Sequence, residues 1–293
     1  MGKRSILWLA ILLLLAGSAS AGFTMHLRTM SEVVSDQQAR INFSLVNAGD
    51  ETAYQIFLET ILPEGFTSSS VYSPSLRPNQ PLSGVLDIKF PQNAVEGRYP
   101  VVIMLHYSDR NSYPFSIIFP EYIKYKEGMG SKVQLMIPTV EITGPDQVGF
   151  NLKVYNQDSK EHNLTIRLYT PKEIEANITV KDIQLTGQSN TVVENNIWSN
   201  GALYDSDYLI LASVSYIEDG RVYSSIAQGR AKIVKPLGMQ IGENLFKEFQ
   251  WALILLILLV GVVVVFFMLR EKPGGRDEKK GRPEKKARKQ KAR

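Results

Sequence analysis

Apolar and polar side chains alternate along most of the chain between residues 22 and 235. One such stretch places Ile41, Phe43 and Leu45 on one parity and polar residues between them. A period of two residues is typical of strands with one face in a core and the other in water. Turn-forming sequences, such as Asn-Ala-Gly-Asp at 47–50, separate these segments. The pattern predicts an all-β region of antiparallel strands without a long amphipathic helix.

The two halves of this region repeat each other. A near-constant offset relates matching landmarks: Asn47 and Asn156, Pro63 and Pro171, Tyr99 and Tyr208, Tyr107 and Tyr216, Tyr113 and Tyr223. Each copy has room for some seven short strands, which is the size and rhythm of an immunoglobulin-like β-sandwich. We therefore predict tandem immunoglobulin-like sandwiches at residues 22–127 and 131–235. The glycine-rich joint at 128–130 should let them flex.

Two of the repeated tyrosines admit two interpretations. Tyr99 and Tyr208 open matching strands, each after a turn-like sequence. They could form a platform on which a ligand stacks, or they could be corner or core tyrosines of the kind common in sandwiches. The second interpretation is favoured, because it requires nothing beyond the fold.

Apolar segments lie near both ends of the chain. Lys3 and Arg4 precede a short apolar run and small residues, which predicts a signal peptide at 1–21 with cleavage after Ala21. Residues 249–269 form an uncharged run that is long enough for a transmembrane helix. A connector at 236–248 precedes it, and a disordered basic tail at 270–293 follows. The positive-inside rule then predicts a type I single-pass protein of the plasma (inner) membrane, with an extracytoplasmic ectodomain and a cytoplasmic C-terminus.

Charge and cysteine content narrow the function further. The tail holds 12 Lys/Arg and 4 Asp/Glu, a net of +8 against +4 for the whole chain, so the predicted ectodomain is acidic. An acidic ectodomain argues against nucleic-acid binding there. The tail could meet anionic lipid headgroups, although a simple stop-transfer flank is the favoured explanation. With no cysteine, the ectodomain must rely on hydrophobic cores, which suits a prokaryotic envelope.

One stretch of the first repeat resembles a known group of domains. The residues are Ile41 through Asp50, Ala53, and the Leu-Pro-Glu-Gly-Phe corner at 62–66. They are similar to exported prokaryotic Ig-like domains of the CARDB type and the NPCBM-associated type. The second repeat matches this pattern loosely, since Asn156-Gln157-Asp158 lacks the glycine. The resemblance implies interaction or spacer modules without catalytic residues.

The candidate chemistry is sparse. His26, His106 and His162 are isolated in the sequence, and no nucleophile motif or phosphate-binding loop is present. Turn acids at 205–207 and 218–220 could offer oxygens to calcium but form no complete ligand loop. We therefore expect no catalytic, cofactor or metal site. Three sequons place their asparagines on the polar parity of strands and are candidate N-glycosylation sites: Asn42, Asn163 and Asn177.

Binding is the function that these observations favour. The sequence predicts a non-catalytic, membrane-anchored envelope or surface protein whose ectodomain meets a protein or glycan. Candidate contact residues lie in an expected loop at 67–81 and in the 195–204 segment: Tyr72, Leu76, Arg77 and Trp198. The alternative is an accessory subunit of a membrane complex, such as a transporter, a glycosylation complex or the protein-export machinery.

Overall fold

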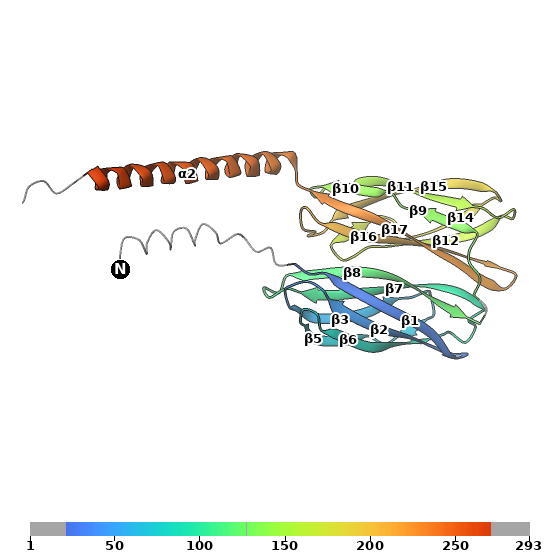
Figure 1. The fold of residues 1–293 in the computed structure, drawn as a ribbon. Helices are drawn as coiled ribbons and strands as arrows, with labels where there is room; N and C mark the ends of the chain where they lie inside the picture. Colours follow the sequence, from blue (N-terminus) through green and yellow to red (C-terminus); the bar gives the residue numbers. More distant parts are fainter. Residues whose placement is uncertain (1–21, 127, 271–293) are drawn as a thin grey trace, which may run out of the picture. The chain divides into compact units, whose positions relative to one another are not determined.

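The computed structural model describes residues 22–126 and 128–270. The predicted signal peptide, with its cleavage after Ala21, and the tail beyond Arg270 lie outside the described residues. The chain divides into two compact units at Pro236. The first unit holds two β-sandwiches and the second holds one helix (Figure 1).

Two antiparallel sheets form the first sandwich. One has the strand order β1-β2-β6-β4, and the other has the order β5-β3-β7-β8. The strands are β1 (Met25–Ser35), β2 (Gln38–Asn47), β3 (Ala53–Ile61), β4 (Thr67–Ser68), β5 (Val71–Leu76), β6 (Pro81–Lys89), β7 (Gly97–Ser108) and β8 (Pro114–Tyr125).

The second sandwich repeats this arrangement. Its first sheet has the order β13-β15-β11-β9, and its second has the order β14-β12-β16-β17, with β10 added in parallel to β17. The strands are β9 (Val133–Met136), β10 (Thr139–Thr143), β11 (Val148–Asn156), β12 (His162–Tyr169), β13 (Ile174–Ala176), β14 (Val180–Leu185), β15 (Ser189–Ser199), β16 (Asp207–Glu218) and β17 (Arg221–Val234).

The strand pairings of the two sandwiches correspond one to one along their main strands. The β2–β6 pair of the first corresponds to β11–β15 of the second, and the β3–β7–β8 order corresponds to β12–β16–β17. Strand sets of this kind, in two facing sheets, are those of an immunoglobulin-like sandwich. The predicted all-β, immunoglobulin-like architecture is confirmed, and the structure contains two copies of it.

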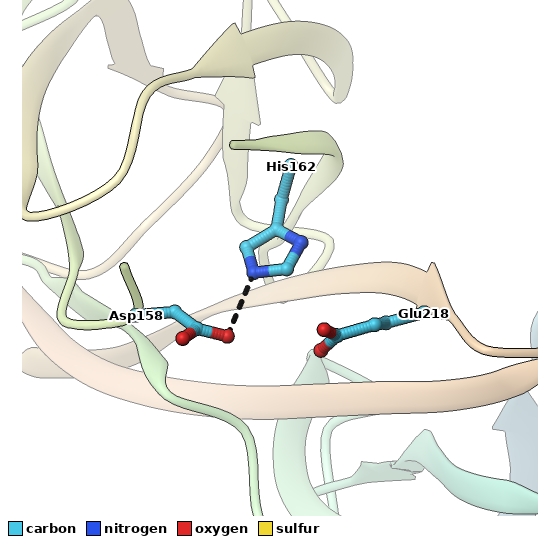
Figure 2. A group of neighbouring side chains, drawn as sticks. All are labelled: Asp158, His162 and Glu218. Atoms are coloured by element: carbon cyan, nitrogen blue, oxygen red, sulfur yellow. Dashed lines mark hydrogen bonds and ion pairs between the residues drawn. The ribbon is translucent and has the colours of Figure 1, made fainter. Parts of the chain in front are cut away.

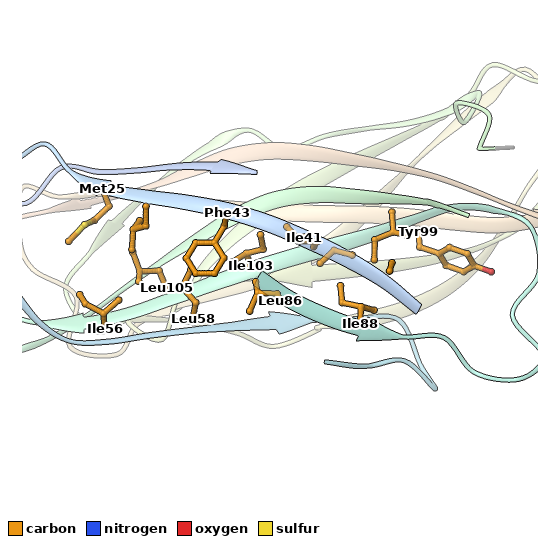
Figure 3. Packing of buried hydrophobic residues seen from close by; sticks show 14 of the residues in the cluster. Met25, Ile41, Phe43, Ile56, Leu58, Leu86, Ile88, Tyr99, Ile103 and Leu105 are labelled. Atoms are coloured by element: carbon orange, nitrogen blue, oxygen red, sulfur yellow. The ribbon is translucent and has the colours of Figure 1, made fainter. Parts of the chain in front are cut away.

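Each sandwich has a core of its own between its sheets. In the first, Ile41, Leu86, Ile103 and Leu105 are fully buried and interdigitate across the two sheets (Figure 3). The second core uses the same kind of residues, with Leu152, Val154, Ile210 and Val214 among them. These positions have the inward parity that the alternating pattern predicts.

A buried asparagine fixes the same turn in both sandwiches. Asn47 is fully buried, and its Nδ2 donates to the carbonyl oxygens of Glu51 (2.7 Å) and Leu76 (3.4 Å). Asn156 donates in the same way to the carbonyls of Lys160 (2.8 Å) and Leu185 (3.3 Å). A turn tied to the neighbouring strand by an amide side chain leaves few backbone groups unsatisfied. The two copies therefore share these hydrogen bonds as well as the residues that form them.

The repeated tyrosines are structural. Tyr99 is buried, and its hydroxyl donates to the carbonyl oxygen of Val95 just upstream. The hydroxyl of Tyr208 accepts from the amide of Leu203, also upstream (3.1 Å). A hydroxyl that bonds back to the preceding backbone is the behaviour of a corner tyrosine in sandwiches. The favoured interpretation of these two residues is confirmed.

Helix α2 (Leu237–Arg270) forms the second unit and contains the predicted span at 249–269. Its described side chains include exposed apolar residues such as Leu245, Leu255 and Val262. Within the described part of the chain, no helix qualifies by length and apolar character as a membrane span. The anchor therefore stays a prediction.

Candidate functional site

The predicted binding residues do not form one surface. Tyr72 is exposed on β5, and Arg77 is exposed just after it, but Leu76 is buried and belongs to the core. The expected loop at 67–81 contains β4 and β5 instead, because β5 pairs with β3 and turns Leu76 inward. Trp198 lies half-buried on β15, in the other sandwich. The prediction is wrong for Leu76, and Trp198 lies in a different sandwich from Tyr72 and Arg77.

The three sequon asparagines have accessible side chains. Asn163 and Asn177 are exposed, and Asn42 is half-buried with its Nδ2 donating to Glu32 Oε1 (3.2 Å). Asn42 and Asn163 lie on strands with the outward parity that the sequence predicts, whereas Asn177 lies between β13 and β14. Their positions leave room for a glycan, and their modification stays a prediction.

The two sandwiches meet through a third apolar cluster. Val102 and Ile118 of the first sandwich and Leu211 of the second are fully buried there, and Met104 and Tyr169 are nearly so. Val102 and Leu211 occupy equivalent outward positions of β7 and β16, since the offset of the internal repeat relates one to the other. A strand with both faces covered reads as a continuous apolar run, as residues 100–105 do.

Polar contacts surround this apolar cluster. The Tyr122 hydroxyl accepts from the amide of Ile226 (2.6 Å), and Ser224 Oγ donates to the Arg98 carbonyl (2.6 Å). Gly97 pairs with Val222 and so bridges the two sheets, and a Cβ on Gly97 would lie 2.2 Å from the Val222 carbonyl oxygen. An apolar centre with a hydrogen-bonded rim is typical of a stable interface. The sandwiches form one block in this structure, in contrast to the flexing expected at 128–130.

Two grooves flank the interface and are related by the internal repeat. The larger, of about 660 Å³, is lined by Glu64, Phe66 and Tyr99 from the first sandwich and by Asn163, Tyr216 and Ile217 from the second. The smaller, of about 380 Å³, is lined by the matching segments: Tyr107, Tyr113 and Ser116 from the first sandwich, and Glu173 and Gly201 from the second. Exchange of the repeats therefore converts one groove into the other.

A buried carboxylate distinguishes the smaller groove. Glu173 is buried and accepts a hydrogen bond from Ser116 Oγ (2.5 Å), which in turn accepts from the amide of Lys172 (2.7 Å). Burial, and then the charge of Glu173, raises the pKa of Tyr107. Gly65 stands at the position of the first repeat that matches Glu173. The carboxylate that lines the larger groove is the neighbouring Glu64, which is exposed, so of these two grooves only the smaller holds a buried carboxylate.

A mixed acid–histidine cluster lies next to the larger groove. Asp158 follows β11, His162 begins β12 and Glu218 ends β16, so a turn and two strands place them together (Figure 2). His162 Nε2 lies 3.2 Å from Asp158 Oδ2, and one ligand atom from each of the three residues lies within 4.8 Å of the others. Asp158 and His162 are each only 5 % exposed. These residue types are metal ligands as well as ion-pair formers.

Two lysines neutralise this cluster in the structure. Lys132 Nζ lies 3.1 Å from Asp158 Oδ1, and Lys160 Nζ pairs with Glu218 and, at 3.8 Å, with Asp219. The hydrogen bond from Lys132 is the largest cause that lowers the pKa of Asp158 to about 2, and bonds from His162 and Ser159 act in the same direction. The same contact raises the pKa of Lys132, and the bond to Glu218 raises that of Lys160.

A tyrosine ring packs against the imidazole of His162. The rings of His162 and Tyr216 have centroids 4.3 Å apart, and Tyr216 stacks in turn on Tyr223 at 5.3 Å. Burial raises the pKa of Tyr216, so this hydroxyl stays neutral beside the charged groups. His162 is therefore fixed in position before any ligand arrives.

The sequence alone does not reveal this cluster. His162 is isolated in the sequence because no second histidine follows at metal-binding spacing, while its partner Asp158 lies upstream across a tight turn. The sequence suggests Glu218 as a calcium ligand together with its neighbours in the turn, and the structure places it beside His162 instead. His106 forms a simpler pair with Glu59 at 2.9 Å. Only the pairing of β12 with β16 brings the three ligands together.

Comparison with known proteins adds little to this picture. No family model matches the chain, and a search of curated proteins found no match. Among solved structures, the chain is similar to the E. coli chaperone DraB (16 % identity, TM-score 0.27, covering 36 % of this chain and 56 % of that one). It is also similar to the chaperone YadV (12 % identity, TM-score 0.29, 70 % and 98 %) and to a Salmonella α-2-macroglobulin variant (11 % identity, TM-score 0.30, 75 % and 17 %). The chain thus spans about half of DraB and about a sixth of the macroglobulin.

Proposed function

We propose that this chain is a membrane-anchored, non-catalytic binding protein of the cell envelope, whose paired sandwiches present the larger inter-sandwich groove to a protein or glycan. The observation that carries this proposal is the groove itself, which both sandwiches line and which the interface at Val102 and Leu211 holds open. A preformed site costs little ordering entropy when a partner binds. Ile217, 68 % exposed at its edge, offers apolar contact area.

Placement in a membrane rests on the sequence and on the exposure of α2. The described apolar side chains of α2 include Leu255, Leu259 and Val262, each more than 60 % exposed, which would be unfavourable in water over such a length. Lipid would cover them, and the basic residues after Leu269 would stay on the cytoplasmic side.

An accessory subunit of a membrane complex is the second candidate, and the first turns of α2 favour it. Leu237, Ile241, Leu245 and Phe249 recur every four residues and are exposed up to the start of the predicted span. Such a stripe could pack against a helix of another integral-membrane protein.

Crosslinking in native membranes, followed by mild-detergent purification and mass spectrometry, separates the two candidate functions. Membrane partners in a fixed ratio favour the subunit, and recovery of the protein alone favours the surface binder.

Topology is tested by cysteine labelling, since the natural chain contains no cysteine. We expect a membrane-impermeant maleimide to label Tyr72→Cys in intact cells and to label Glu284→Cys only after the membrane is opened. The reverse pattern, or labelling of both sites in intact cells, would contradict the proposed anchor.

The groove is tested by substitution at its edge. Ile217→Asp should weaken partner capture, while Val85→Asp, on the exposed face of β6, should not.

A further inference from the structure

We propose that Asp158, His162 and Glu218 form a binding site for a divalent cation of the zinc type, from which the cation displaces two lysine ammonium groups. The three side chains already converge, with one ligand atom from each within 4.8 Å of the others. This inference goes beyond the proposed function, because the groove could receive its partner with or without a metal.

The geometry of two of the ligands is close to that of a bound state. Two ligand atoms on one tetrahedral zinc ion lie about 3.4 Å apart, given bonds of about 2.0–2.1 Å to nitrogen and oxygen. His162 Nε2 and Asp158 Oδ2 are 3.2 Å apart. Both residues are buried and fixed, the aspartate by the amide of Ser159 (2.7 Å to Oδ1) and the histidine by Tyr216. Little reorganisation is therefore needed before this pair can bind an ion.

Glu218 supplies the third ligand from a more accessible position. Its side chain is 18 % exposed at the end of β16, and Asp219 and Gly220 make the tight turn that follows. A glutamate at a strand end can rotate toward the imidazole without movement of the backbone. Three protein ligands with a water molecule in the fourth position is a common arrangement for zinc.

The lysines occupy the place of the cation rather than rule it out. Their side chains are 66 % exposed for Lys132 and 59 % exposed for Lys160, so each ammonium group can turn into water at small cost. A doubly charged ion between Asp158 and Glu218 replaces the charge that the lysines provide. The imidazole nitrogen, which is a good ligand for zinc-like ions, disfavours Mg²⁺ and Ca²⁺, because these ions prefer oxygen.

The first sandwich shows that the cluster is not a by-product of the fold. The positions of the first repeat that match Asp158 and His162 hold Gly49 and Ala53. A Cβ at Gly49 would lie 2.1 Å from the carbonyl oxygen of Gly22, so no side chain fits there. Only the position that matches Glu218 is acidic, Asp109, so that copy forms the same sandwich without the aspartate and the histidine, and the second copy does not need them for its core.

Metal titration of the full chain in detergent, without a histidine tag and after chelator treatment, tests the site. We expect Zn²⁺ to raise the melting temperature, Co²⁺ to give visible absorption bands of an ion with nitrogen and oxygen ligands, and Mg²⁺ and Ca²⁺ to do neither. Glu218→Gln should weaken zinc binding about tenfold or more. Removing the competing charges, with Lys132→Ala and Lys160→Ala together, should tighten it severalfold.

Glu59→Gln is the matched control, because Glu59 pairs with His106 at 2.9 Å and no third ligand joins that pair among the described residues. Zinc binding should be unchanged in this variant. No response to millimolar Zn²⁺, or binding lost in Glu59→Gln and kept in Glu218→Gln, would overturn the proposal. If Glu218→Gln fails to fold, the lysine double variant still decides, since weaker binding there would show that the lysines do not compete. No partner is used, so failure here leaves the groove proposal standing.

Discussion

The two sandwiches share a frame but fill one corner in opposite ways. Beside the Asn47 turn of the first, Phe23, Tyr107 and Phe115 pack together with ring centroids 5.2 to 5.5 Å apart. In the second sandwich, Tyr216 keeps this stack with Tyr223 (5.3 Å), but the strand pairing places Ser131 at the position of Phe23, and His162 packs on Tyr216 instead (4.3 Å). The same strands thus support an apolar plug in one copy and a charged cluster in the other.

The difference separates the features that both copies of the repeat share from those that vary between them. The buried asparagine and the inward parity of the strands are common to both copies, because they satisfy the backbone and fill the core. The corner outside that frame is free to change. Asp158 can exist there because the chain before β9 leaves room, whereas Gly22 closes the matching space at Gly49. Charge at this corner is therefore a property of the second copy.

The largest predicted effect breaks the contact between the copies. Leu211→Ala should lower the free energy of unfolding by about 3 kcal/mol, because a fully buried leucine loses its packing and leaves a cavity. Its counterpart Val102→Ala should cost less, since a smaller side chain is removed. Urea denaturation of the full chain in detergent, followed by far-UV circular dichroism, measures both. Met30→Ala, at a residue 70 % exposed, is the control and should change the free energy by under about 0.5 kcal/mol.

The interface also shows the limit of sequence reasoning. Residues 100–105 and 209–212 are apolar at successive positions, and alternation correctly assigns one parity of each to a core. The other parity, with Val102 and Leu211, would face solvent in a simple alternating strand. Continuous apolar strands predict burial on both faces, but which surface covers the second face depends on how the copies dock. The alternation of apolar and polar residues in either strand does not predict this docking geometry.

Most of the fold can be predicted from the sequence. Alternation, turn sequences and the constant offset between landmarks predict two sandwiches, since these features are local or recur along the chain. The acid–histidine cluster cannot be predicted in this way, because it depends on β12 lying beside β16. The 67–81 segment resembles a loop because its prolines and serines hide a short edge strand, β5, whose inward Leu76 completes the core.

The shared frame can be tested at its buried amides. Asn47→Ala and Asn156→Ala should each lower the free energy of unfolding by about 2 kcal/mol, because each leaves buried carbonyl oxygens without a donor. Similar losses in the two variants, measured by urea denaturation, would support equivalent roles. A large loss of unfolding free energy in one variant and none in the other would contradict the equivalence of the two asparagines.

Acid titration sharpens the difference between the corners. The pKa of Asp158 is lowered from its ordinary value to about 2, so its contribution to stability is present above about pH 4 and is lost as the pH falls toward 2. The stability difference between the natural chain and Asp158→Asn should be constant from pH 7 to pH 5 and should shrink below pH 4. Urea midpoints at each pH measure it. A difference that stays constant down to pH 2 would contradict the ion pair with Lys132.

The smallest predicted effect concerns a tyrosine pair on which the copies diverge. The Tyr113 hydroxyl donates to the carbonyl of Gly201 across the interface (2.7 Å), whereas Tyr223, its match in the sequence, takes the strand position of Phe115 and stacks on Tyr216. Tyr113→Phe keeps the ring and removes one exposed hydrogen bond, so it should cost about 0.5 kcal/mol. In the background of Leu211→Ala, where the interface is already weakened, the same change should cost less. Equal costs in both backgrounds would mean that this bond acts independently of the apolar contact, because additivity is the behaviour of uncoupled sites.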